Sequence, residues 1–127
     1  HGINAIYKSF SIQNIEYAIN AIRTLNIKGA GITMPFKIDA LDYLDILDGD
    51  VEKIGSCNTI VNNSGVLKGY NTDYLAVKDH LKKIIGIKHL TILGTGGYSK
   101  AVQHACQSLN IHINIISRDN WNDINRS

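Results

Sequence analysis

A cluster of glycines between a predicted strand and a predicted helix constrains this chain more than any other feature. Residues 94–97 (GTGG) follow the apolar run 89–93 and precede the helical pattern of residues 98–109. A second apolar run, 111–117, is typical of a strand. In such a unit the glycines permit a tight turn and let a phosphate approach the N–H groups at the helix start. The sequence therefore predicts the first β-α-β unit of a dinucleotide-binding domain.

The match to the usual G-x-G-x-x-G pattern is incomplete, because Ser99 stands where the third glycine is expected. Serine is small enough for the helix to pack closely on the strand. A purely structural turn is the alternative interpretation, but the strand–helix–strand context favours nucleotide binding. We predict that the cofactor-binding turn consists of Gly94, Thr95, Gly96, Gly97 and Tyr98.

The end of the second strand indicates which cofactor binds. NAD sites usually place an acidic side chain there, to accept hydrogen bonds from the ribose. Here the residues are Ser117 and Arg118. The arginine is a fixed cation with planar donors, which suits a 2′-phosphate. NADP is therefore favoured over NAD, although Asp119 follows directly and a plain surface arginine is the alternative.

Strand and helix patterns also alternate before the glycine cluster, which predicts α/β architecture with mostly parallel sheets. The predicted strands are 3–11, 29–34, 57–61 and 66–70, with a hairpin turn at 62–65. The predicted helices are 13–25, 39–47 with Asp39 as N-cap, 50–54, and one capped by Thr72 or Asp73 that runs to Ile85. We expect this last helix to separate a unit at 1–87 from a second unit at 88–127.

Polar residues stand near three predicted element boundaries. Lys37 follows the strand that Pro35 ends, Asn58 begins the next strand, and Asp73 begins a helix. Three loops could thus converge on one cleft at a sheet edge, where ligands tend to bind. A lysine beside an aspartate suits the movement of a proton on and off an alcohol. Taken singly, however, the lysine is most simply a surface residue and the aspartate a helix cap.

The order of the motifs along the chain strengthens this interpretation. Four segments resemble, in series, the motifs of the shikimate and quinate dehydrogenase family: 28–37 (KGAGITMPFK), 55–60 (GSCNTI), 69–73 (GYNTD) and 93–102 (LGTGGYSKAV). The resemblance covers nearly the whole chain. It implies an incomplete amino-terminal substrate-binding α/β domain, residues 1–87, followed by the truncated start of a Rossmann NADP-binding domain, residues 88–127.

The resemblance implies NADP-dependent, reversible reduction of 3-dehydroshikimate to shikimate, in aromatic amino-acid biosynthesis. It implies Lys37 and Asp73 as the catalytic pair, with Lys37 exchanging the proton, and it implies no metal. The substrate-binding residues that we expect on this basis are Thr33, Asn58, Asn71 and Thr72. Alternatives are a quinate or other polyol-acid dehydrogenase of the same family, or an inactive truncated product.

Three residues depart from the pattern of the family's main branch. Tyr74 stands where glycine is usual, Tyr98 where a small residue is common, and Cys57 in place of a small aliphatic residue. These features look more like the shikimate dehydrogenase-like branch. Tyr74 either narrows the pocket beside the lysine–aspartate pair or packs on a neighbouring helix.

Bulk properties exclude several other classes of protein. The net charge of +2, without a basic cluster, gives no reason to expect nucleic-acid binding. No apolar run reaches the length of a membrane span. Cys57 and Cys106 lie far apart in the sequence and form no metal or redox motif, so we expect a cytoplasmic protein. We expect it to be monomeric or homodimeric. Because His1 is not an initiator methionine and only two of about six Rossmann strands are present, we expect an internal fragment, inactive alone.

Overall fold

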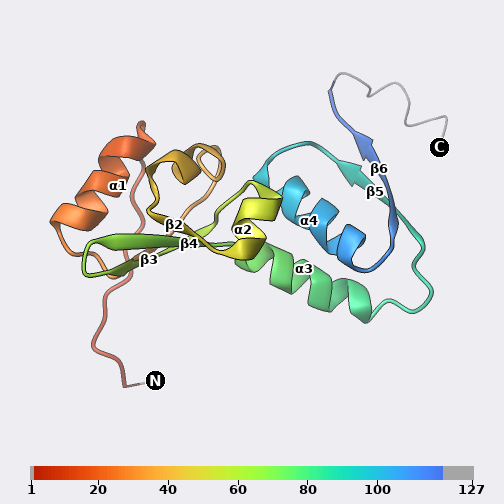
Figure 1. Ribbon diagram of the computed structural model, residues 1–127, viewed down its shortest axis with the longest axis horizontal. Helices are drawn as coiled ribbons and strands as arrows, with labels where there is room; N and C mark the ends of the chain where they lie inside the picture. Colours follow the sequence, from red (N-terminus) through yellow and green to blue (C-terminus); the bar gives the residue numbers. More distant parts are fainter. Residues whose placement is uncertain (1, 119–127) are drawn as a thin grey trace.

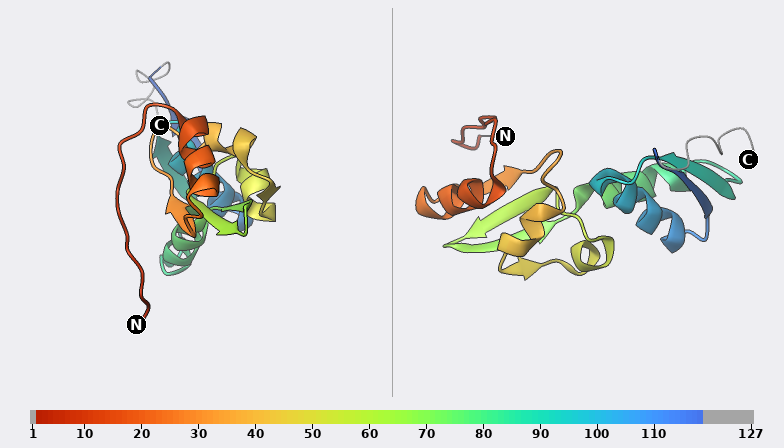
Figure 2. Two further views of the ribbon diagram at one scale, coloured as in Figure 1. Left: turned by 90° about the vertical axis from the view of Figure 1, so that its left-hand side faces the viewer. Right: turned by 90° about the horizontal axis from the view of Figure 1, so that it is seen from above.

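The computed structural model describes residues 2–118. They form two β-sheets, each with helices packed on it, at opposite ends of an elongated molecule (Figure 1; Figure 2, right). The first sheet has four strands and the second has two. The helix that follows the first sheet packs mainly against the helix of the second. The α/β class predicted from the sequence is confirmed. Among residues 2–118, no helix has the length and apolar character needed to span a membrane.

The first sheet is mixed, and this corrects the expectation of mostly parallel pairing. Its strands, in spatial order, are β1 (Gly29–Gly31), β3 (Thr59–Asn63), β4 (Val66–Tyr70) and β2 (Ile46–Leu47). Strand β3 is antiparallel to both β1 and β4, and only β2 runs parallel to β4. The short turn between β3 and β4 leaves no room for a crossover connection, so those two strands must pair antiparallel.

The first sheet is covered by helices whose apolar residues face it. In α1 (Ile15–Thr24) the buried side chains recur at Ile15, Ile19 and Ile22, the spacing of one helical face. Asn14 caps this helix by accepting a hydrogen bond from Tyr17 N at 3.1 Å. The core that these residues join also contains Val51 from α2 (Gly49–Ile54), Ile60 from β3 and Leu67 from β4.

Two predicted elements of the first unit are wrong. Residues 3–11 are extended but pair with no strand of the described chain, and Ile6 is 95% exposed. Alternation of side chains makes a strand only where a neighbouring backbone supplies the hydrogen bonds. Residues 39–47 form the 3-10 helix η1 (Asp39–Tyr43) and then β2, instead of one helix. The N-cap position of η1 is occupied by Ile38 and not by Asp39, and no side chain makes a capping hydrogen bond there.

The second sheet forms the predicted β-α-β unit. Strands β5 (His89–Leu93) and β6 (His112–Ile116) pair in parallel, with Leu93 opposite Ile116. Helix α4 (Gly97–Ser108) connects them and buries Ala101, Ala105 and Cys106. Against α4 packs α3 (Thr72–Lys82), which ends three residues before the predicted Ile85. The start of a Rossmann-like unit is thus confirmed.

Arg23 of α1 joins three parts of the first unit. Its guanidinium makes a two-pronged contact with the Asp45 carboxylate, Nη1–Oδ2 at 2.6 Å and Nη2–Oδ1 at 3.2 Å. It also donates to the carbonyls of Tyr43 and Gly65. Asp45 Oδ2 accepts a further bond from Leu67 N at 2.6 Å. The hydrogen bond from Arg23 is the main reason that the pKa of Asp45 lies below its ordinary value of 3.8, and the bond from Leu67 N lowers it further.

Replacing Asp45 tests this network. Because the pKa of Asp45 is lowered in the folded chain, the stabilisation is fully present above about pH 3.8 and is lost as the pH falls below it. We expect Asp45→Asn to lower the unfolding midpoint at pH 7 by about 2–8 °C. The difference in unfolding midpoint between wild type and Asp45→Asn should disappear as the pH falls towards 3. Thermal unfolding followed by circular dichroism between pH 7 and pH 3 measures it.

Asp79→Asn is the matched control. Asp79 pairs with Lys83 at 2.8 Å on the surface of the chain, and both side chains are 70% exposed. Exposed pairs of this kind contribute little, so its midpoint should stay close to wild type. Equal losses in the two variants would contradict a special role for the Arg23–Asp45 contact.

Candidate active site

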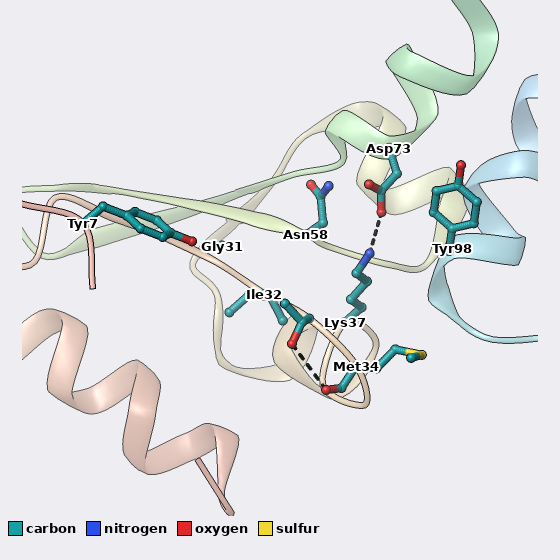
Figure 3. Close-up of a pocket in the computed structure, with 9 residues that line it drawn as sticks. Tyr7, Gly31, Ile32, Met34, Lys37, Asn58, Asp73 and Tyr98 are labelled. Carbon is teal, nitrogen blue, oxygen red and sulfur yellow. Dashed lines mark hydrogen bonds and ion pairs between the residues drawn. The ribbon is translucent and has the colours of Figure 1, made fainter. Parts of the chain in front are cut away.

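The first sheet and α3 bring Lys37 and Asp73 together across 36 residues of sequence. Lys37 Nζ donates to Asp73 Oδ2 at 2.6 Å, and the side chains are 16% and 21% exposed (Figure 3). Partial burial strengthens the attraction between the two charges relative to a pair in bulk water. The pair that the sequence predicted as catalytic is therefore preformed and still open to a ligand.

Backbone hydrogen bonds fix the segment that carries Lys37. Phe36 N donates to Thr33 O at 3.0 Å, which closes the turn at Pro35 that the sequence predicted. Cys57 N donates to Lys37 O at 2.7 Å. The backbone of Lys37 is thus held against the residues just before β3. Only the side-chain torsions of Lys37 remain to be ordered when it contacts Asp73.

Asn71 places Asp73, and this corrects the expected helix cap. The side chain is 4% exposed; its Oδ1 accepts from Tyr74 N at 3.1 Å and its Nδ2 donates to Ser56 O at 2.8 Å. Asn71, rather than Thr72 or Asp73, is therefore the N-cap of α3. Both ends of its amide are engaged and Asn71 is not among the residues that line the pocket, so these contacts give it a role in placing Asp73, and its contact with a substrate stays a prediction.

Asn58 and Thr72 contact each other at the same helix start. Asn58 Nδ2 donates to Thr72 Oγ1 at 2.9 Å, and Thr72 N donates to Asn58 Oδ1 at 2.9 Å. Asn58 lines the pocket, whereas Thr72 lies on the surface outside it. One N–H of the Asn58 amide has no partner in these contacts and remains available to a ligand.

A pocket of about 490 Å³ opens beside this pair. Of the residues predicted from the sequence, its lining contains Thr33, Lys37, Asn58, Asp73 and Tyr98. It also contains four that sequence reasoning missed, Tyr7, Gly31, Ile32 and Met34. Gly31, Ile32 and Met34 belong to the KGAGITMPFK segment, so that motif carried a signal for them. Tyr7 had none, because it lies outside the four segments that resemble the family's motifs.

The glycine turn has the backbone that a phosphate site needs. Gly94 has φ +105°, which favours glycine, and its N–H donates to Ile116 O at 2.8 Å. Gly96 begins α4 without a side-chain cap, so the first N–H groups of the helix are left for a ligand or water. Ser99 is 7% exposed and donates to Gly94 O at 2.8 Å, which fits the close packing predicted at this position. Thr95 lies exposed between the two glycines.

Gly97 brings the glycine turn against the lysine. A Cβ on Gly97 would lie 2.6 Å from Ser56 Oγ and 2.9 Å from Lys37 Cβ. Such distances exclude any side chain unless the neighbours move. The start of α4 and the stem of Lys37 are therefore in direct contact.

Ser117 and Arg118 follow β6 close to the glycine turn, since Ile116 O accepts the Gly94 N–H. Arg118 is exposed and makes no hydrogen bond or ion pair with any residue between 2 and 117. Its guanidinium is thus available to a ligand. Asp119, the acidic residue that left NAD as a possible cofactor in the sequence analysis, lies outside the described residues.

The two interior departures from the family pattern have structural roles. Tyr74 is 5% exposed, its hydroxyl accepts from Lys78 Nζ at 2.8 Å, and its ring lies 4.7 Å from that of His104. It therefore packs between α3 and α4 and does not narrow the pocket. Cys57 donates to Thr59 O at 3.2 Å, and burial raises the pKa of its thiol. A raised pKa disfavours the thiolate, which is the reactive form of a cysteine.

Comparisons with known proteins find similarity to shikimate dehydrogenases. Residues 1–60 match the family model of the shikimate dehydrogenase substrate binding domain. The chain is 43% identical over 103 residues to a shikimate dehydrogenase-like protein of Haemophilus influenzae, which covers 80% of this chain and 38% of the relative. It is 40% identical over 106 residues to a shikimate dehydrogenase (NADP(+)) of Pyrococcus furiosus, which covers 81% and 39%.

A solved structure is similar over both sheets. The shikimate dehydrogenase of Aquifex aeolicus matches with a TM-score of 0.85 and 33% identity, covering 92% of this chain and 46% of that chain. The chain spans about two fifths of the length of the two curated relatives, 38% and 39%.

Substitution of Asn71 tests whether it orders the site or binds a ligand. Asn71→Ala removes the cap of α3 and the bond to Ser56 O, so we expect the free energy of unfolding to fall by about 1–3 kcal/mol. Asn71→Ser keeps a capping oxygen but cannot reach Ser56 O, and should lose less. Urea unfolding of wild type, Asn71→Ser and Asn71→Ala gives the three free energies of unfolding, which should decrease in that order. Unchanged stability in Asn71→Ala, with weakened ligand binding, would support the role expected from the sequence.

Proposed function

We propose that this chain is part of a shikimate dehydrogenase and that the full-length protein interconverts 3-dehydroshikimate and shikimate with NADP. The match of residues 1–60 to the substrate-binding-domain model and the similarity to NADP(+) shikimate dehydrogenases support this. The observation that carries the proposal is the Lys37–Asp73 contact, at 2.6 Å, in a pocket that the start of α4 also lines. The start of α4 contributes Tyr98 to this pocket, and its uncapped N–H groups suit a phosphate. A proton-exchanging lysine near a dinucleotide phosphate site is the arrangement that an alcohol dehydrogenation uses, which supports the proposal.

Lys37 moves the proton of the reaction. NADPH, when bound, supplies the hydride that reduces the carbonyl carbon. The Lys37 ammonium donates its proton to the carbonyl oxygen as negative charge develops there, which yields the alcohol. In the reverse direction the hydroxyl proton returns to Nζ. Asp73 holds Nζ through the 2.6 Å bond and steadies the charge that changes on it.

Asn58 and Thr33 would orient the substrate ring. Asn58 is held by its two bonds to Thr72, so its remaining N–H is directed before a ligand arrives. Thr33 Oγ1 makes only a long contact of 3.4 Å with Met34 O and is exposed in the pocket. A ring that carries several hydroxyl groups offers partners to both side chains.

The residues of the second unit fit a phosphorylated dinucleotide. No atom lies within 4 Å of a Cβ built on Gly94 or on Gly96, so the backbone there is open to a pyrophosphate. The uncapped N-terminus of α4 attracts negative charge. Arg118 and Ser117 would hold the 2′-phosphate, which is the group that distinguishes NADP from NAD. The relative from Pyrococcus furiosus carries NADP(+) in its name.

Quinate or another polyol acid is the alternative substrate. A relative at 43% identity is named only a shikimate dehydrogenase-like protein. The inactivity of these 127 residues alone, the cytoplasmic location and a monomeric or homodimeric state stay predictions. The experiments below therefore use the full-length protein.

Lys37→Ala tests the proton transfer. In the full-length protein we expect kcat to fall by about 10²–10⁴-fold while the Kd for NADP changes by less than about threefold. Lys37→Arg keeps a cation beside Asp73 but cannot give up its proton, so its turnover should be similarly low. Steady-state kinetics with shikimate and NADP, with Kd from fluorescence titration, measure both quantities.

The control is Lys53→Ala, on the exposed side of α2. It should leave kcat within about twofold of wild type, as for most surface substitutions. Near-normal turnover in Lys37→Ala or Lys37→Arg would refute the assignment of the proton to Lys37.

Arg118→Asp tests the choice of cofactor. Loss of the cation should weaken binding of the 2′-phosphate, and the new carboxylate should favour the free ribose hydroxyls. We expect the ratio of kcat/KM for NADP to that for NAD to fall by about tenfold or more. An unchanged ratio would show that Arg118 does not read the 2′-phosphate.

A further inference from the structure

The side chain of Tyr98 faces the substrate pocket and not the phosphate turn to which its backbone belongs. We propose that the Tyr98 ring forms the wall of the pocket beside Lys37 and so determines which ring-shaped hydroxy acids the protein accepts. This inference rests on the proposed function. It assigns the specificity of the first unit to a residue that the second unit supplies.

The first step is the position of the ring. Tyr98 lines the same pocket of about 490 Å³ as Lys37 and Asp73, and the other lining residues all lie between Tyr7 and Asp73 in sequence. Lys37 Nζ lies 5.8 Å from the centroid of the Tyr98 ring. Figure 3 shows the ring standing beside the Lys37–Asp73 contact, with Asn58 on the opposite side of that contact. A substrate oxygen that reaches Nζ therefore brings its neighbouring atoms against the ring.

The second step is that the ring is held in this position by its neighbours in the chain. Gly97 packs on Lys37 Cβ and Ser56 Oγ, with no space for a side chain of its own. On the other side, Ser99 is buried and its hydroxyl bonds to Gly94 O at 2.8 Å. Tyr98 stands between two fixed residues, so its Cα cannot withdraw from the pocket without breaking one of these contacts.

The third step separates the side chain from the phosphate turn. A phosphate at the start of α4 is bound by backbone N–H groups, which any residue at position 98 supplies. The Tyr98 side chain is 55% exposed, and its hydroxyl makes no hydrogen bond with any residue between 2 and 118. The ring also lines a second, apolar cavity of about 290 Å³ beside Val77, Leu81 and Val102. Tyr98 thus stands between two cavities, and its removal would let the substrate pocket extend towards the apolar one.

The consequence concerns the shape of the substrate. Shikimate has an unsaturated, flatter ring, whereas quinate is saturated and carries one more hydroxyl group. A flat ring packs better against an aromatic wall, and the two additional tetrahedral ring carbons of quinate, one of which carries the extra hydroxyl, need more room. Tyr98 should therefore favour shikimate, and truncation of its side chain should relax that preference.

Tyr98→Ala in the full-length protein is the direct test. We expect kcat/KM for quinate, relative to that for shikimate, to rise by about tenfold, which is the size of effect that one pocket group produces. The Kd for NADP should change by less than about threefold, because the backbone N–H groups remain. Tyr98→Phe keeps the wall and should keep the wild-type ratio within about twofold. Steady-state kinetics with both acids and NADP give the ratio.

Tyr17→Ala is the matched control, since Tyr17 lies on α1, is 72% exposed and takes no part in the pocket lining. Its ratio should equal that of wild type. An unchanged ratio in Tyr98→Ala would overturn the inference, and so would an equal change in Tyr98→Phe, which would assign the effect to the hydroxyl. Weaker NADP binding in Tyr98→Ala at a constant ratio would also overturn it.

The two proposals fail in different ways. If the wild-type protein oxidises neither acid with NADP, the proposed function is wrong and the inference falls with it. If wild type is active and Tyr98→Ala keeps its substrate ratio, only the role of Tyr98 is wrong.

Discussion

The segment Ser56–Asn58 is the structural centre on which the site depends. Its backbone accepts from Asn71 and from Ile32, and donates to the carbonyls of Lys37 and Tyr70. The segments that carry Thr33, Lys37 and Asp73, and the start of α4 at Gly97, are thus bonded to these three residues or packed on them. Ser56 and Cys57 are fully buried, where an unmade hydrogen bond costs about 1–3 kcal/mol, so the arrangement has few alternatives. The fold therefore holds the backbone that carries Lys37 close to the start of the helix that carries Asp73.

The sequence predicted those parts that local pattern determines. The periodicity of α1 and the strand–glycine–helix series around Gly94 are local, and both elements are present. Residues 3–11 have a strand pattern but no partner, and Asp45 contacts Arg23 and Leu67 instead of continuing a helix. Such outcomes depend on which backbones and charges meet in three dimensions, and a single sequence does not contain that information.

The candidate site shows the same division. Motif order was sufficient to select Lys37 and Asp73, because two residues 36 positions apart matched separate segments of one family pattern. Motif order did not reveal that Asn71, which stands among polar neighbours, is buried and engaged at both ends of its amide. Asparagine caps and asparagine ligands have the same sequence signal, and only burial separates them.

The contact of Gly97 with the stem of Lys37 has a consequence for how such a protein can change. The turn proposed to bind the cofactor and the lysine proposed to exchange the proton occupy adjoining volume, so a substitution in one alters the packing of the other. Their effects on fitness will not add, since groups in contact are energetically coupled. A lineage that acquires a new cofactor preference through the start of α4 must compensate near Lys37, whereas one that changes Arg118 can leave the catalytic pair untouched. Under the proposed function, a change of cofactor preference therefore disturbs fewer contacts at the end of β6 than at the glycine turn.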